Sequence, residues 1–454
     1  MVEVLQIETP SLGDRSYLVH DGAVALVIDP QRDIDRVTRL AAEVGVRITH
    51  VAETHIHNDY VTGGLALARA TGGAYLVNGA DPVRFTRTPL HEGDGFQIGD
   101  AMRVRVLATP GHTFTHLSYV LTADGAVTGV FTGGSLLYGA TGRPDLLGPD
   151  STGPLAMAQY ASAQRLAREL PDETEIFPTH GFGSFCAAGQ EKVTRASTIG
   201  HEKLVNPALT QSRQAYTGTL LAGLDTWPAY YAHMGPANLA GPDGPDLSPP
   251  RPAGAGDIQR RIEAGEWVID LRDRAAFAAG FVPGSVNFTL GSSFATYVGW
   301  TVPWGAPITL LGETPDQVAE AQRELARIGI DRLAAAAAGR PRDWAGGRPL
   351  SAVRLAKHGD LADRLTRQPA PAILDVRRNL EWAESHVAGA IHIPLHDLPG
   401  RLGDVPPGEV WVHCQSGYRA MAAASLLATP DRQVISVNDH FSNAAAAGVP
   451  LEPA

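Results

Sequence analysis

The sequence contains few cysteines, few lysines and no long apolar run. Its 454 residues include two cysteines, Cys186 and Cys414, so a disulfide framework is excluded and a reducing compartment is expected. No uninterrupted apolar stretch approaches the roughly 20 residues of a membrane helix. The first residues show neither the basic nor the apolar region of a signal peptide. We therefore expect a cytoplasmic protein that does not span a membrane.

Positive charge is also scarce. There are 37 Lys and Arg residues against 48 Asp and Glu residues, which gives a net charge of −11, and no basic run occurs. Nucleic acids and anionic membranes are therefore not expected partners. The length suits two to four domains, and the 44% of hydrophobic residues is enough to form real cores.

Short β-rich runs alternate with helical stretches in the first half of the chain. Examples are the strands expected at 24–28, 48–51 and 117–121 and the helix expected at 153–170. The segment 236–256 is dense in proline and glycine, which is typical of an interdomain linker. An N-terminal α/β domain over 1–235 is therefore predicted.

Histidines follow the expected strands at three places in this domain. His55-x-His57-x-Asp59 comes directly after the strand at 48–51. His112 follows a Pro-Gly turn, and His180 follows a Pro-Thr pair. Neutral imidazoles suit Zn or Fe(II), so these residues predict a metal site.

These pieces resemble the metallo-β-lactamase superfamily, whose motif is H-x-H-x-D-H followed by a His, a bridging Asp and a last His. Here Tyr60 occupies the fourth motif position, and Gly134 occupies the position of the bridging Asp. The resemblance implies an αββα sandwich. It also implies that the usual two-metal site has lost two ligands.

The stretch around Gly134, continuing to Arg143 and Asp145, resembles persulfide dioxygenases and their fusions with rhodaneses. In those dioxygenases two His and one Asp hold a mononuclear Fe(II), with open positions for O2 and a thiolate. The two histidines correspond to His55 and His112, but the Asp falls on Gly134, which has no side chain to bind metal.

We therefore predict a re-formed site with one metal ion per chain, Fe(II) in preference to Zn. Its ligands would be His55, His57 and His112, completed by Asp59, His180 or water. Two neighbours are candidate substrate-binding residues. Tyr60 would be either a wall residue or a phenolate ligand. Arg143 would contact an anionic thiol or form an ion pair.

A weak internal repeat follows the linker. Residues 268–288 parallel residues 373–393, and both contain Asp-x-Arg after an apolar strand and then a turn ending in Gly-Ser or Gly-Ala. Both copies resemble the start of a rhodanese domain. We predict a rhodanese-like domain without a catalytic cysteine at 257–345 and a rhodanese domain at 362–454. Two α/β rhodanese-like domains would thus follow the sandwich.

Cys414 begins a short loop between an apolar strand at 409–413 and an Ala-rich helix at 420–427. The loop Cys-x-x-Gly-x-Arg resembles the persulfide-forming loop of rhodaneses. Its backbone N–H groups and the helix N-terminus favour a thiolate, and Gly417 lets the loop close. Arg419 would orient a sulfur donor or tie the loop to the domain. The remaining loop residues, Gln415, Ser416 and Tyr418, are candidate substrate contacts.

The two resemblances together predict a sulfur-metabolism enzyme. Cys414 would carry sulfane sulfur as a persulfide, coupled to a persulfide-dioxygenase-like metal domain. Thiosulfate and a small thiol or its persulfide are the expected substrates, and homo-oligomerisation is left open. Two alternatives are a zinc hydrolase of the glyoxalase II type and a metal-free scaffold that binds a thiol and regulates the rhodanese. Metal content distinguishes these hypotheses.

Overall fold

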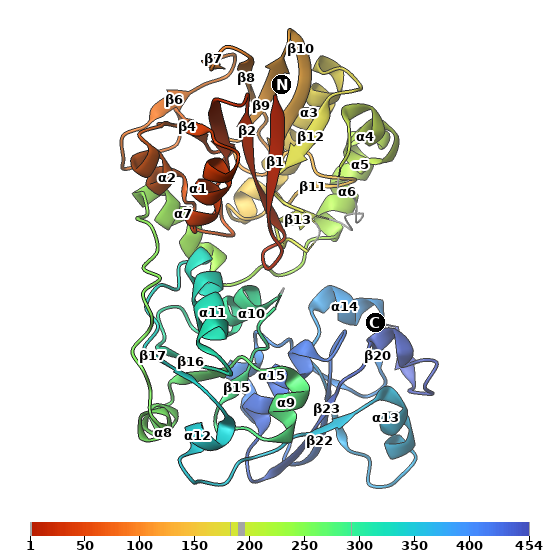
Figure 1. The fold of residues 1–454 in the computed structure, drawn as a ribbon. Coiled ribbons are helices and arrows are strands. Elements are labelled where there is room, and N and C mark those ends of the chain that lie inside the picture. The colour runs from red at the N-terminus through yellow and green to blue at the C-terminus, as the bar shows by residue number, and fades with distance from the viewer. Residues whose placement is uncertain (1, 182, 189–195, 292, 454) are drawn as a thin grey trace. The chain divides into compact units, whose positions relative to one another are not determined.

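The computed structural model describes residues 2–181, 183–188, 196–291 and 293–453, and the chain divides into two compact units (Figure 1). The N-terminal unit comprises Met1–Asp246 together with Ala326–Gly329. The C-terminal unit comprises Leu247–Leu325 and Ile330–Ala454. Each is described by itself below.

Two mixed sheets form the centre of the N-terminal unit. The six-stranded sheet has the order β1-β2-β3-β4-β5-β6, and the five-stranded sheet has the order β12-β10-β9-β8-β7. Their strands are β1 (Glu3–Thr9), β2 (Asp14–His20), β3 (Val24–Ile28), β4 (Arg47–Ala52), β5 (Ala74–Asn78), β6 (Thr88–Leu90), β7 (Gly95–Ile98), β8 (Met102–Ala108), β9 (Leu117–Ala123), β10 (Ala126–Gly133) and β12 (Glu175–Pro178). A small ribbon pairs β11 (Thr141–Gly142) with β13 (Ala187–Ala188).

Helices cover the outer face of each sheet. They are α1 (Asp35–Glu43), α2 (Gly64–Thr71), α3 (Pro149–Glu169), α4 (Ile199–Val205), α5 (Pro207–Thr210), α6 (Arg213–Ala222) and α7 (Tyr231–Ala240). Strand β3 shows why its sequence is apolar throughout. Leu26 and Ile28 lie in the core between the sheets, whereas Ala25 and Val27 pack against α1 and α2. The αββα sandwich predicted from the sequence is confirmed.

The candidate site residues follow strands that end at the same edge of their sheets. β3 and β4 are parallel neighbours, and so are β10 and β12. The loops after Ala52, Ala108, Gly133 and Pro178 carry the histidines and Gly134. Because carboxyl ends of parallel strands meet at one edge, these loops converge.

Two parallel sheets form the C-terminal unit, with the orders β15-β14-β16-β17 and β18-β23-β22-β19-β21. The first contains β14 (Trp267–Asp270), β15 (Val286–Asn287), β16 (Ile308–Gly312) and β17 (Ala335–Ala338), with helices α8 (Ala255–Glu263), α9 (Arg274–Ala279), α10 (Phe294–Thr301), α11 (Pro315–Arg327) and α12 (Pro341–Ala345). The second contains β18 (Arg354–Ala356), β19 (Ala372–Asp375), β21 (Ile391–His392), β22 (Gly408–His413) and β23 (Arg432–Val437), with helices α13 (His358–Leu365), α14 (Asn379–Glu384) and α15 (Tyr418–Leu427). The pair β20 (His386–Val387) and β24 (Leu451–Glu452) lies beside it.

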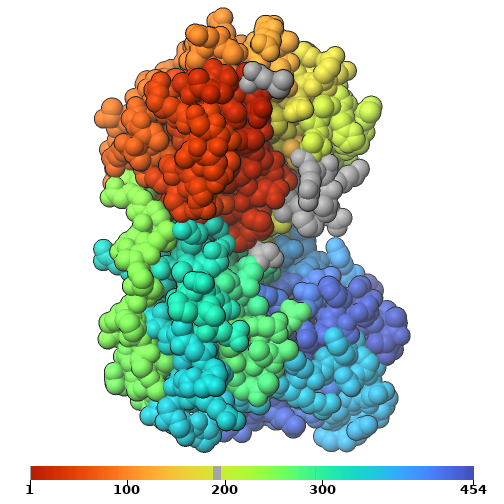
Figure 2. All heavy atoms as spheres, viewed as in Figure 1, coloured from red at the N-terminus to blue at the C-terminus, as the bar shows by residue number. Residues whose placement is uncertain are grey.

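The predicted repeat is visible in this topology. The first sheet has the order β15-β14-β16-β17, and the corresponding strands of the second sheet lie in the same order, β21-β19-β22-β23. The all-atom view shows the parts in green to teal and in blue packed side by side within this unit (Figure 2). A bond from the amide N–H of Asn287 to Oγ of Ser425, 3.1 Å long, joins them.

The Asp-x-Arg pair has the same role in both copies. Asp270 and Arg272 form a buried ion pair of 2.6 Å, and Nη2 of Arg272 also donates to the carbonyl of Gly280. Asp375 and Arg377 form one of 2.7 Å, and Nη2 of Arg377 donates to the carbonyl of Ser385. Each pair ties the end of a central strand to the end of the helix that follows it, so the pairs brace the two copies.

The linker starts later than the sequence predicted. Helix α7 continues to Ala240, beyond the predicted start at 236. Asn238 explains this, because its side chain is buried and Nδ2 donates to the carbonyls of His57 and Tyr60 at 2.9 Å. Residues 236–240 therefore belong to the N-terminal unit. In the part of the chain that the structure describes, no helix combines the length and the apolar character needed to cross a membrane.

Candidate metal centre and sulfur-transfer loop

Three buried histidines meet where the strand-end loops converge. His55, His112 and His180 are each at most 1% exposed. One ring nitrogen of each lies within 4.8 Å of one ring nitrogen of the other two. The Nε2 atom of each has no hydrogen-bond partner among the described residues. Three buried ring nitrogens without a hydrogen-bond partner are unusual in a folded protein and indicate a missing ligand.

The opposite nitrogen of each ring is held in place. Nδ1 of His55 lies 2.9 Å from Oγ1 of Thr54, and Nδ1 of His112 lies 2.8 Å from the carbonyl oxygen of Arg143. Nδ1 of His180 lies 3.0 Å from Asp14 and 3.2 Å from Asp59. Partners at Nδ1 that leave Nε2 available are the usual surroundings of metal-binding histidines. The donor set therefore fits a metal ion, which His55, His112 and His180 would hold.

Charges around the three rings differ. Burial and neighbouring histidines hold the pKa of His55 and of His112 well below the usual value. Burial also disfavours the charged form of His180, but Asp59 and Asp14 outweigh it and raise its pKa well above 6.5. A metal ion would thus displace a proton from His180 while finding the other two rings neutral.

His57 faces two carboxylates through one ring nitrogen. Its Nε2 lies 3.2 Å from Oδ1 of Asp29 and 3.3 Å from Oε2 of Glu53. Burial opposes the charge on His57, but these two carboxylates raise its pKa to about 10. The structure groups it with Asp59 and His180, and also with Asp29 and Glu53. Nδ1 of His57 has no hydrogen-bond partner among the described residues either. His180 thus joins His55 and His112 in one candidate group, and His57 belongs to a second group with Asp59 and His180.

Gly134 is packed against one of these ligands. A Cβ atom added there would lie 2.4 Å from Cδ2 of His112. The amide N–H of Gly134 donates to Nε2 of the buried His116 at 3.0 Å. The space for the carboxylate expected by family resemblance is thus filled by the His112 ring.

The two candidate substrate residues beside this centre have partners within the protein. Tyr60 is 0% exposed and stacks on His57, with ring centroids 4.4 Å apart. Burial raises its pKa well above 10, which opposes a phenolate ligand. Arg143 is 4% exposed, and its Nε and Nη2 each lie 2.7 Å from an oxygen of Asp145. Tyr60 thus packs on a histidine of the centre, and Arg143 forms an ion pair with Asp145.

Several residues of this centre escaped sequence reasoning. Asp14, Asp29, Glu53 and His116 are all buried around the histidines. Asp29 directly follows the apolar strand β3 and bonds the amide of Thr54 at 2.7 Å, so its strand-end position was a usable signal. Asp14 precedes its partner His180 by 166 residues, and no local pattern links them.

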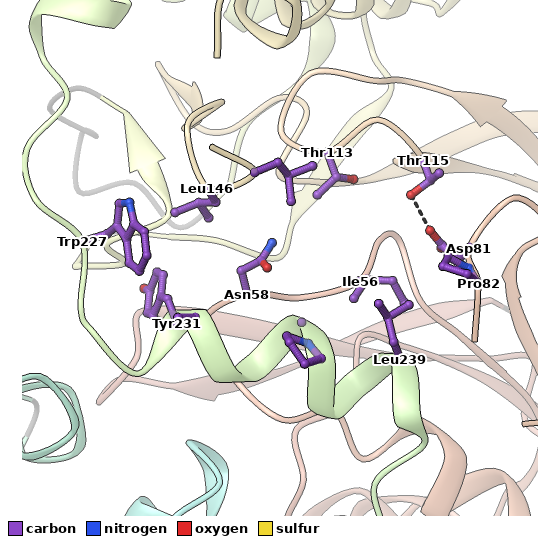
Figure 3. Close-up of a pocket in the computed structure, with 14 residues that line it drawn as sticks. Ile56, Asn58, Asp81, Pro82, Thr113, Thr115, Leu146, Trp227, Tyr231 and Leu239 are labelled. Atoms are coloured by element: carbon purple, nitrogen blue, oxygen red, sulfur yellow. Dashed lines mark hydrogen bonds between the residues drawn. The ribbon is translucent and has the colours of Figure 1, made fainter. Parts of the chain in front are cut away.

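A pocket of about 330 Å³ adjoins the metal-site loops. Ile56 and Asn58 flank His57 in sequence, Thr113 follows His112, and all three line the pocket. Trp227 and Tyr231 form its other end (Figure 3). Cys186 does not line it. That thiol is fully buried, which raises its pKa well above 9, so it is an inert neutral group here.

Backbone donors surround the sulfur of Cys414 in the C-terminal unit. Sγ accepts the amide N–H of Gly417 at 3.1 Å and that of Ala420 at 3.4 Å. Gly417 has φ +94°, and a Cβ there would meet Oδ1 of Asn438 at 2.7 Å. The loop therefore closes around the sulfur only with glycine at 417. In the first copy β16 passes into α11 without a cysteine.

Arg419 ties this loop to the domain. Its Nη1 and Nη2 lie 2.5 Å and 2.7 Å from the two oxygens of Glu381 on α14. The ring of Tyr297, from the first copy, lies 5.8 Å from the guanidinium carbon. Tyr418 donates its hydroxyl to the carbonyl of Thr289 at 3.2 Å. The outer loop residues are Gln415, which is exposed, and Ser416, which is half-buried.

Comparison with known proteins decides the family. Residues 14–180 match the model of the metallo-beta-lactamase superfamily. The chain is 36% identical over 188 residues to the hydroxyacylglutathione hydrolase of Methylococcus capsulatus, covering 40% of this chain and 67% of that protein. The chain belongs to the metallo-beta-lactamase superfamily. This superfamily member is also 29% identical over 208 residues to the human mitochondrial persulfide dioxygenase ETHE1, covering 45% of this chain and 72% of that protein.

The C-terminal part of this superfamily member is a rhodanese-like domain. Residues 358–447 match the rhodanese-like domain model. Among solved structures, a metallo-beta-lactamase from Staphylococcus aureus superimposes with a TM-score of 0.66 at 28% identity. That match covers 74% of this chain and 98% of the other chain. The chain thus combines a metal-binding fold related to persulfide dioxygenase and glyoxalase II with a rhodanese domain.

Proposed function

We propose that this chain is a sulfur-metabolism enzyme with two catalytic centres. The Cys414 loop transfers sulfane sulfur, and the N-terminal metal centre oxidises a thiol persulfide. The sulfur of Cys414, held by two backbone N–H donors at the start of α15, carries this proposal. The relationship to a persulfide dioxygenase supports the second part.

Sulfur transfer at Cys414 is a pair of displacements. The thiolate attacks the outer sulfur of thiosulfate, and the S–S bond breaks with its electron pair leaving on sulfite. The resulting persulfide is then attacked at its outer sulfur by an acceptor thiolate, which restores Cys414. Gly417 and Ala420 stabilise the anionic sulfur through their amides. Arg419 keeps this loop in shape, because its charge is already paired with Glu381.

In the N-terminal unit the residues hold one metal ion and its substrate. His55, His112 and His180 would bind the ion through Nε2, and their Nδ1 partners keep the rings oriented. A bound metal supplies open positions for a thiolate and O2. In the overall reaction a persulfide RSS⁻, O2 and water give RSH and HSO3⁻, so the outer sulfur is oxidised and O2 is reduced. The pocket beside Asn58 would hold the organic part of the persulfide.

The test compares two single variants of the full chain. Cys414→Ser should abolish sulfur transfer from thiosulfate to cyanide, whereas Cys186→Ser, which changes the other thiol, should retain it. Normal turnover by Cys414→Ser would contradict the first part. For the second part, purified protein should contain about one metal ion, and persulfide-dependent O2 uptake should persist in Cys414→Ser but be lost in His180→Gln. Equal O2 uptake by His180→Gln would exclude the proposed centre.

Thioester hydrolysis is the second candidate for the N-terminal unit. The identity to a hydroxyacylglutathione hydrolase favours it. Activation of water by two metals needs a bridging ligand, and Gly134 supplies none. Chelator-sensitive thioester hydrolysis with no persulfide-dependent O2 uptake would establish this alternative.

A further inference from the structure

The pocket beside the metal-site loops is uneven in charge. Apolar side chains form most of its wall, including Trp227, Leu146 and Leu239. Among the described residues that line it, none is Lys, Arg or His, and the only acid is Asp81. An anionic group entering this pocket would thus find no cationic partner in its wall, whereas a cation would find one carboxylate.

Asp81 has one oxygen without a partner. Its side chain is 5% exposed, and Oδ1 accepts the hydroxyl of Thr115 at 2.5 Å. Oδ2 has no hydrogen-bond partner among the described residues. The bond to Thr115 explains how the side chain is oriented, but it leaves the second oxygen unexplained. Buried carboxylate oxygens are normally paired, because burial removes their contact with water.

The charge of Asp81 is little compensated by its neighbours. Arg87 donates Nη2 to the carbonyls of Gly79 and Asp81 at 2.9 Å and 3.0 Å, not to the carboxylate. Burial raises the pKa of Asp81 to about 6, although Thr115 and Arg87 act in the opposite direction. At neutral pH the group is still ionised, and it would gain most from a cationic donor.

Asp81 lies at one end of the pocket, beside Thr115 of the loop that carries His112. In Figure 3 Asp81 and Thr115 lie at one end, Trp227 and Tyr231 lie at the other, and Asn58 is between them. Asn58 follows His57 directly in sequence. A molecule whose sulfur reaches the histidines would therefore present its non-reacting part to the pocket and to Asp81.

We propose that Asp81 determines specificity by binding an ammonium group on the non-reacting part of the thiol substrate. This inference rests on the proposed function for the location of the sulfur. The N-terminal unit would accordingly prefer an amine-bearing thiol to a neutral one, and it would discriminate against a thiol that carries a carboxylate at this place.

Binding is measured with three small probes whose sulfur is blocked by a methyl group. They are S-methylcysteamine, 2-(methylthio)ethanol and 3-(methylthio)propionate, which differ in an ammonium, a hydroxyl or a carboxylate. Calorimetric titration of the full chain should show S-methylcysteamine binding about tenfold more tightly than the alcohol, with the carboxylate weakest. Asp81→Asn should remove this preference while Asn still accepts the Thr115 bond.

Two further variants make the result specific. Asp100→Asn changes the net charge equally at an exposed position and should keep the preference. Thr115→Val removes the partner of Oδ1, leaves the carboxylate, and should also keep it. Equal affinity of the wild-type protein for the three probes, or an unchanged preference in folded Asp81→Asn, would overturn the assignment. Because the probes carry no persulfide sulfur, their binding is measured independently of the reaction. A preference without any persulfide oxidation would refute the proposed function and leave the ammonium site standing.

Discussion

Gly134→Ala tests whether the missing carboxylate position is closed by His112. The added Cβ would lie 2.4 Å from Cδ2 and 2.6 Å from Cγ of His112, about 1 Å closer than an ordinary contact. The ring has little room to retreat. Its Nδ1 bonds the carbonyl of Arg143, and Gly142 lies so close that a Cβ added there would be 2.8 Å from this Nδ1. Overpacking of this kind costs about 1–3 kcal/mol.

For a unit of this size the cost corresponds to a fall in melting temperature of roughly 2–12 °C. Metal content should fall as well, because His112 is one of the three proposed ligands. Gly134→Asp, which restores the family's carboxylate, should be at least as damaging as Gly134→Ala. The structure thus predicts that a carboxylate introduced at this position does not rebuild a two-metal site.

The assay is thermal unfolding together with elemental analysis of the purified full chain. Gly153→Ala is the matched control, because Gly153 lies within α3 and an added Cβ meets nothing within 4 Å. It should stabilise the protein by up to about 1 kcal/mol through helix propensity. If Gly134→Ala matched the wild type in melting temperature and metal content, the closed-space explanation would be refuted.

Two other predictions concern the ion pair behind the Cys414 loop and the wall of the metal centre. Burial raises the pKa of Glu381, but the charge and hydrogen bonds of Arg419 outweigh this effect and lower that pKa to about 2. The ion pair therefore stabilises the protein above pH 4.5, and this stabilisation is lost as the pH falls towards 2. Glu381→Gln should therefore destabilise the protein by up to about 3 kcal/mol at pH 7. In pH-dependent unfolding, the difference in stability from the wild type should shrink below pH 4.5. The variant Glu384→Gln, at an exposed position on the same helix, should show no such loss of stability. Tyr60→Phe removes a long hydrogen bond of 3.4 Å to the carbonyl of Asp29. Metal content should therefore stay unchanged, and the free energy of unfolding should fall by about 1 kcal/mol or less. Loss of the metal in this variant would instead support Tyr60 as a phenolate ligand.

The sequence by itself determined the architecture and most members of the candidate site. Histidines directly after apolar strands indicated the metal-site loops, because strand ends place neighbouring loops together. Cys414, Gly417 and the following helix predicted the sulfur loop through their resemblance to rhodaneses and the local chemistry of the loop, and the structure shows the expected N–H donors around Sγ. The Asp-x-Arg repeat likewise predicted two similar sheets. These features depend on residues that are close in sequence, where periodicity and turn chemistry are informative.

Only the tertiary structure decided how these side chains are partnered. Nε2 of His57 faces Asp29 and Glu53, and His180 lies in one group with His55 and His112 and in another with His57 and Asp59. Arg419 is paired with Glu381, 38 residues earlier, and Gly134 is closed by a ring from another loop. The end of α7 was likewise set by Asn238 reaching back to the metal-site loop, against the local proline and glycine content. Such outcomes depend on which distant segments the sheets bring into contact, and hydrogen bonds and ion pairs between them leave no local pattern in the sequence.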